Sequence, residues 1–153
     1  MSADTRNYVL DISTDLFRLS TESLRLRSNE TLVYATLESL IDSRAASSTY
    51  SDELKPETLR KHLRVVPTSG DIRINLNIRK TSAESLDEAR ARLGQRLGSN
   101  MTLADAISVL LFDYVAEKRA AQVLDRAGLG ENLQNGDESP AGETNAGNVV
   151  PLR

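Results

Sequence analysis

Arginine and asparagine alternate with aliphatic residues in the segment RINLNIRK, residues 73 to 80. Residues two apart point to the same side of a β-strand, so the polar side chains would share one face and the aliphatic side chains the other. Arginine offers a fork of N–H donors, and an asparagine amide both donates and accepts hydrogen bonds. The pattern therefore predicts either a recognition face or the solvated side of a half-exposed sheet. Its polar members are Arg73, Asn75, Asn77 and Arg79.

The residues needed for catalysis or metal binding are scarce. The chain has no cysteine and one histidine, His62, which excludes disulfides, thiolate chemistry and paired-histidine metal sites. The carboxylates form no pair suited to acid–base work. We therefore expect no enzymatic activity, no cofactor and no metal, and we expect His62 to lie on the surface.

The composition is that of a soluble globular chain. Its 153 residues are 39% hydrophobic and 27% charged, enough for one domain or two very small ones. No stretch approaches the roughly 18 apolar residues of a membrane span, and the N-terminus has no signal-peptide pattern. We expect a cytoplasmic protein that does not bind membranes.

The net charge of −3 is unevenly distributed. Residues 129–153 contain four acidic residues and one basic residue, Arg153, so this segment carries the whole net charge. This tail lacks apolar periodicity, and we expect it to be disordered. The balanced remainder does not exclude a polyanionic partner.

The elements after residue 71 read as strand, helix and helix. Thr81 or Ser82 is expected to cap the first helix and Gly98 to end it. Thr102 and Asp105 predict a capping box for the second helix, which carries a broad apolar stripe from Leu103 to Val115.

The N-terminal half repeats this order, with strand NYVLDIS, a helix over 14–27 and a helix over 28–43. The turn LRLRSNETL matches QRLGSNMTL at an offset of 71, whereas the strands match at 66. The offsets predict an internal duplication whose second copy has the longer first helix. The expected organisation is a first unit at 1–42, a linker with a possible short helix at 43–70, a second unit at 71–128 and the tail at 129–153.

The segments RINLNIRK and LGSNMT and the apolar stripe resemble the ribbon-helix-helix family, which includes the Arc and MetJ repressors. The two copies together resemble the tandem, TraY-type accessory proteins of plasmid conjugation. The resemblance covers residues 6–42 and 71–120. It implies a mostly α fold with a two-stranded antiparallel β-ribbon, in which two tandem ribbon-helix-helix units form an intramolecular pseudo-dimer. The chain would be a monomer of this kind or a homo-oligomer.

The resemblance also implies sequence-specific binding of double-stranded DNA, with the ribbon in the major groove. The role would be that of a transcriptional regulator or a plasmid transfer accessory factor, with other relaxosome or regulatory proteins as further partners. The expected base-reading residues are Arg73, Asn75, Asn77, Arg79, Asn7, Val9 and Asp11. The expected phosphate contacts are Thr102, Asn100, Ser99, Thr31, Asn29, Ser28 and Lys80.

The first strand departs from the second, because its outward residues Asn7, Val9 and Asp11 carry no positive charge. Asp11 can accept a hydrogen bond from cytosine and Val9 can contact a thymine methyl group. The first copy either reads a different half-site or serves only as a structural partner. If the strands pair, the ribbon has unlike sides and its site is not a simple palindrome. The alternative function is an antitoxin-like or adaptor protein-interaction module.

Overall fold

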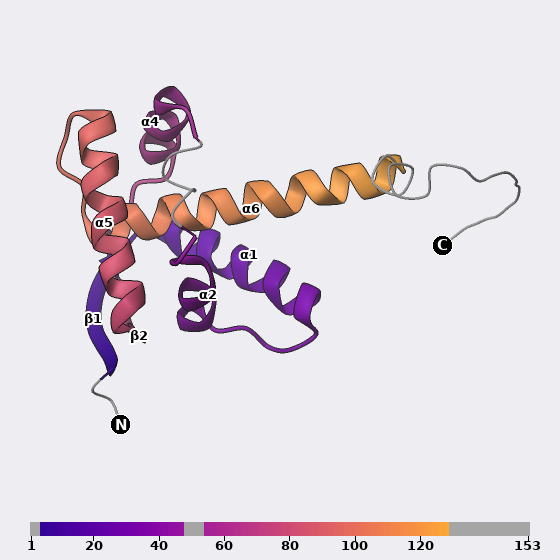
Figure 1. Ribbon diagram of the computed structural model, residues 1–153, viewed down its shortest axis with the longest axis horizontal. Helices are drawn as coiled ribbons and strands as arrows, with labels where there is room; N and C mark the ends of the chain where they lie inside the picture. Colours follow the sequence, from indigo (N-terminus) through magenta and orange to yellow (C-terminus); the bar gives the residue numbers. More distant parts are fainter. Residues whose placement is uncertain (1–3, 48–53, 129–153) are drawn as a thin grey trace, which may run out of the picture. The chain divides into compact units, whose positions relative to one another are not determined.

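The computed structural model describes residues 4–47 and 54–128 (Figure 1). The described residues are mostly helical, with one two-stranded antiparallel sheet, as the sequence predicts. The elements are β1 (Thr5–Ile12), α1 (Thr14–Thr31), α2 (Leu37–Arg44), α4 (Pro56–Val65), β2 (Ile72–Arg79), α5 (Lys80–Leu97) and α6 (Leu103–Ala127).

The two strands pair with each other over their full length, although about 60 residues of sequence separate them. Thr5 lies opposite Arg79 at one end of this ribbon, and Ile12 lies opposite Ile72 at the other. The predicted alternation is confirmed, because Leu76 and Ile78 are buried, Ile72 and Ile74 are half-buried, and the residues between these four are exposed. One face of the ribbon therefore packs on the core and the other is open to solvent.

The core is built around the first half of α6. Residues 106–111 are buried without interruption, so this part of the helix is surrounded on all sides. Leu86 and Leu93 of α5 and Leu40 of α2 are fully buried as well. The predicted apolar stripe of α6 is thus confirmed as core.

The two strand–helix–helix segments, here called the first and second copy after the predicted duplication, follow one constant offset. The helices α1 and α5 both have 18 residues, and they start at Thr14 and Lys80, an offset of 66. Their C-caps, Leu32 and Gly98, share that offset and both adopt the left-handed conformation. The expected offset of 71 at the turn, and the longer first helix of the second copy, are therefore wrong.

The error at the first turn has a local cause. The sequence SNET predicts the start of a helix, because Ser, Asn and Thr are good N-caps. These residues instead form the last turn of α1, because Leu32 donates its N–H to the Ser28 carbonyl and Thr31 Oγ1 donates to the Arg27 carbonyl. The helix α2 begins only after Thr36.

The caps of the second copy are partly as predicted. Gly98 ends α5, and the capping box of α6 is present, with Thr102 N–H donating to Asp105 Oδ2 at 2.9 Å and Asp105 N–H donating to Thr102 Oγ1 at 3.1 Å. The expected cap at Thr81 or Ser82 is wrong, because α5 begins at Lys80 without a side-chain cap.

The expected short linker helix exists as α4, but the expectation that His62 is exposed is wrong. His62 is only 7% exposed. Its ring stacks on Phe112 at 4.3 Å between centroids, and its Nε2 lies 2.8 Å from Ser108 Oγ. Burial of this ring lowers the pKa of His62 below its usual 6.5.

The chain divides into a compact unit, Met1–Ala116, and a second unit, Glu117–Arg153, into which α6 continues. The predicted tail at 129–153 lies outside the described residues. None of the described helices is both long and apolar enough to cross a bilayer.

Candidate functional site

The structure brings the seven predicted base-reading residues together on the solvent side of the ribbon. Asp11 lies opposite Arg73, Val9 opposite Asn75 and Asn7 opposite Asn77, while Arg79 lies opposite Thr5. All seven are exposed. We call this surface the ribbon face, defined by Asn7, Val9, Asp11, Arg73, Asn75, Asn77 and Arg79.

Residues that face each other on the ribbon face belong to pairs whose backbones do not hydrogen-bond to each other. The N–H groups of Asn77 and Arg79 point away from β1 and donate to carboxylates of α2, to Glu38 Oε2 at 3.4 Å and to Asp42 Oδ1 at 3.0 Å. In an antiparallel pair, such residues bring their side chains closest together. The side chains of the ribbon face are thus close enough to act in cross-strand pairs.

The strongest of these pairs joins Asp11 and Arg73. Arg73 donates from Nε to Asp11 Oδ1 at 2.9 Å and from Nη2 to Asp11 Oδ2 at 3.2 Å. The hydrogen bonds and charge of Arg73 lower the pKa of Asp11, so its carboxylate is ionised at neutral pH. The sequence indicated both residues as base readers but not this contact, which depends on the strand register.

The next two levels of the ribbon face, Val9 with Asn75 and Asn7 with Asn77, are neutral. Val9 and Asn75, in the middle, are themselves 66 positions apart, so equivalent residues of the two copies face each other there. At the same offset of 66, Asn7 is the equivalent of Arg73 and Asn77 is the equivalent of Asp11. These two asparagines face each other on the far side of the Val9–Asn75 pair. One half of the ribbon face carries an ion pair where the other half carries two amides.

The basic end of the ribbon lies at the start of β1 and the end of β2. Arg79 and Lys80 follow each other there, and Arg6 lies opposite Ile78. All three basic residues are exposed. At the opposite end of the ribbon, the charges of Asp11 and Arg73 cancel each other.

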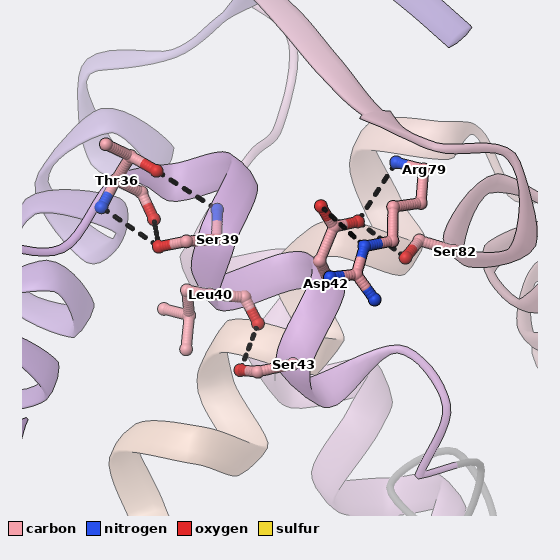
Figure 2. A network of polar contacts seen from close by, with 7 residues as sticks. All are labelled: Thr36, Ser39, Leu40, Asp42, Ser43, Arg79 and Ser82. Carbon is pink, nitrogen blue, oxygen red and sulfur yellow. Dashed lines mark hydrogen bonds and ion pairs between the residues drawn. The ribbon is translucent and has the colours of Figure 1, made fainter. Parts of the chain in front are cut away.

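A polar network anchors the basic end to α2 (Figure 2). Asp42 accepts from the Arg79 N–H at 3.0 Å and from Ser82 Oγ at 2.6 Å, and its Oδ2 lies 4.0 Å from Arg79 Nε. Thr36 and Ser39 form a reciprocal capping box that fixes the start of α2. Glu38 and Asp42 therefore cover the outer edge of β2, a role that no local sequence signal indicated.

The predicted phosphate contacts of the second copy lie together in the turn before α6. Thr102 is part of the capping box with Asp105, and Ser99 and Asn100 are exposed. Ser99 and Asn100 also line a shallow depression of about 360 Å³, together with Arg90, Gly94 and Met101 among others. Lys80 is separate from this group, at the first position of α5.

The predicted phosphate contacts of the first copy are not at a helix start. Ser28, Asn29 and Thr31 occupy the last turn of α1, and Ser28 Oγ accepts the N–H of Ala35 at 2.9 Å. At the constant offset, Thr36 is the residue that corresponds to Thr102, and it caps α2. The expectation that Ser28, Asn29 and Thr31 lie at the start of a helix is therefore wrong.

The turns of the two copies also differ in polarity. Leu32, Val33 and Tyr34 are 88%, 67% and 96% exposed. Gly98, Ser99 and Asn100 hold the corresponding positions in the second copy. The first turn thus places three large apolar residues in solvent. The sequence alignment at an offset of 71 did not reveal this difference, because it does not pair these residues with Gly98, Ser99 and Asn100.

No acidic, histidine or cysteine cluster within residues 4–47 and 54–128 is suited to holding a metal ion. Comparison with known proteins assigns the chain to no family, because no protein-family model, curated protein or solved structure matches it.

Proposed function

We propose that this protein binds double-stranded DNA sequence-specifically and without catalysis, with the ribbon face in the major groove. The observation that carries the proposal is the exposed row of arginine and asparagine side chains on a two-stranded antiparallel ribbon. A ribbon of this width fits the major groove, where each base pair presents its own pattern of donors and acceptors. The resemblance of the sequence to ribbon-helix-helix proteins supports the same function.

In this proposal one chain acts as an intramolecular pseudo-dimer. The constant offset of the two strand–helix–helix segments and the pairing of their strands support it. The ribbon then needs no second chain to present both of its strands to DNA. A monomeric chain bound to one site is the expected complex.

Affinity would come from contacts to the DNA backbone. Beyond the N–H groups used by the two capping boxes, the first turns of α2 and α6 offer backbone amides to phosphate, and Arg6 and Lys80 add positive charge at one end of the ribbon. Thr36 replaces Ser28, Asn29 and Thr31 as the phosphate contact of the first copy. The protein would act as a transcriptional regulator or a plasmid transfer accessory factor, in the cytoplasm and beside other DNA-bound proteins.

Specificity would come from the successive levels of the ribbon face. Asn7, Asn75 and Asn77 have the donor and acceptor needed for adenine, whereas Val9 suits a thymine methyl group. Because the levels differ, the expected site is not a simple palindrome.

The triple variant Arg73→Ala/Asn75→Ala/Asn77→Ala tests the proposal. Each lost base contact costs about 1–3 kcal/mol of specific binding, so the variant should bind its site no better than unrelated DNA. Titration of labelled duplexes measures both affinities. Arg25→Ala is the control, because it removes one positive charge from α1 and none from the ribbon. Unchanged affinity and discrimination in the triple variant would refute DNA recognition by this face.

A second candidate is a protein-interaction module of the antitoxin or adaptor kind. The exposed turn at Leu32, Val33 and Tyr34 favours it, because large apolar residues grouped in solvent mark interaction sites. The double variant Val33→Ser/Tyr34→Ser distinguishes the two functions. Loss of a stoichiometric partner with DNA binding intact would assign the turn to a protein partner.

A further inference from the structure

We propose that Asp11 positions Arg73 to read guanine, and that this pair fixes one G·C base pair at one end of the DNA site. The inference rests on the proposed function and identifies a feature of the DNA that the protein selects. It also gives Asp11 a role that neither residue suggests alone. Asp11 would act through Arg73 as a positioning residue.

The geometry of the pair leaves the reading edge of the guanidinium available. Arg73 uses Nε and one N–H of Nη2 to bind Asp11. Its remaining donors are the two N–H groups of Nη1 and the second N–H of Nη2. One donor from each of Nη1 and Nη2 forms a parallel fork, the arrangement that binds O6 and N7 of guanine. Asp11 thus holds the arginine from one side without covering this fork.

The carboxylate adds a second criterion. Its oxygens have acceptor capacity beyond the two bonds from Arg73, and cytosine N4 is a donor in the major groove beside guanine O6. The donor fork of Arg73 beside the acceptor oxygens of Asp11 matches a G·C pair, which presents guanine O6 and N7 as acceptors and cytosine N4 as a donor. With A·T, the fork meets only one acceptor on adenine, and the charged pair is desolvated without full compensation.

The electrostatics favour specificity over general affinity. Because Asp11 neutralises Arg73, the pair adds no net attraction to phosphate, and it contributes only where the bases match it. The exposed fractions of the two side chains, 69% for Arg73 and 51% for Asp11, leave both accessible to a ligand. Their equivalents in the other copy, Asn7 and Asn77, carry no charge. The guanine requirement therefore applies to one end of the site only.

The test compares the full-length wild type with Asp11→Ala and Glu22→Ala. Both variants remove one carboxylate that is paired with an arginine, but Glu22 pairs with Arg25 within α1. A site is first selected from random duplexes by the wild type. Each protein is then titrated against that duplex and against duplexes with single base-pair replacements. Asp11→Asn, which preserves the size of the side chain, is the second variant at this position.

Replacing the G·C pair should weaken wild-type and Glu22→Ala binding at least about tenfold, but Asp11→Ala binding by less than about threefold. Preferences at the other base pairs should survive in Asp11→Ala, which a general structural defect would not allow. The freed arginine should steepen the salt dependence of Asp11→Ala binding by about one phosphate contact.

Full discrimination at this base pair in Asp11→Ala and Asp11→Asn would overturn the inference while leaving the proposed function intact. A wild-type site without a G·C pair at either end would do the same. A wild type that selects no sequence would overturn both.

Discussion

The helices α1 and α5 each end at a single residue in the left-handed conformation. Leu32 and Gly98 hold equivalent C-cap positions, with φ of 60° and 72°. Glycine adopts this conformation readily, whereas an L-residue with a side chain is strained there. Gly98 was identified from sequence as a helix end because it is glycine. Leu32 ends α1 in the same conformation, but leucine gives no sequence signal for a helix end.

Exchanging the residue types at these two positions should change stability in opposite directions. Leu32→Gly should raise the free energy of unfolding by about 1 kcal/mol, and Gly98→Ala should lower it by about 1 kcal/mol. Space is not the cause at Gly98, because a Cβ there would have no neighbour within 4 Å. Urea denaturation measures both effects. A destabilised Leu32→Gly would contradict the strain assigned to Leu32.

The expectation that His62 is exposed is wrong because one face of the short helix α4, with Leu59 and His62, is buried. The polar neighbours of His62 suggested exposure, but only the fold brings it against Phe112 and Ser108. No local pattern contains that information.

The buried ring makes stability depend on pH. Because the folded-state pKa of His62 lies below 6.5, the unfolded chain binds a proton first as the pH falls. The contribution to stability is therefore complete above pH 6.5 and declines as the pH falls through the lowered folded-state pKa. Between about pH 7.5 and about pH 5, the wild type should lose more stability than His62→Gln, in which this titration is absent. Equal losses in denaturation experiments would contradict the burial of a neutral imidazole.

At the scale of elements, the sequence predicted what depends on local periodicity. The alternation in β2, the Gly98 stop and the Thr102–Asp105 capping box are all local patterns, and each was found. The boundary between α1 and α2 was missed because Ser28, Asn29 and Thr31 suit a helix start as well as a final turn. The contacts of α2 with β2 could not be predicted, since they join residues about 40 positions apart.

The carboxylate of Asp42 should be the main polar anchor of α2. Asp42→Ala removes the acceptor of the Arg79 N–H and of Ser82 Oγ. Hydrogen bonds to a charged group contribute about 1.5–3 kcal/mol, so we expect a loss of this size in the free energy of unfolding. Asp87→Ala, which breaks an exposed pair with Arg90, is the matched control and should cost less than about 0.5 kcal/mol. Similar unfolding midpoints for both variants would show that Asp42 is not an anchor.

At the scale of the whole molecule, two strand–helix–helix segments of one chain together complete a two-stranded ribbon. The repeated order of strand, helix and helix and the outward residues of each strand could be predicted from the sequence. The cross-strand partners were not, because they require the register that places Asp11 opposite Arg73. The register gives the ribbon face an ion pair at one end and amides at the other.

Selection of bound duplexes from a random pool by the full-length protein tests the central claim most directly. A ribbon face with unlike ends predicts one enriched site that is not a palindrome. Enrichment of a palindrome would mean that two like ribbons, or two chains, read the DNA. The absence of any enriched sequence would contradict the proposal that this face reads DNA.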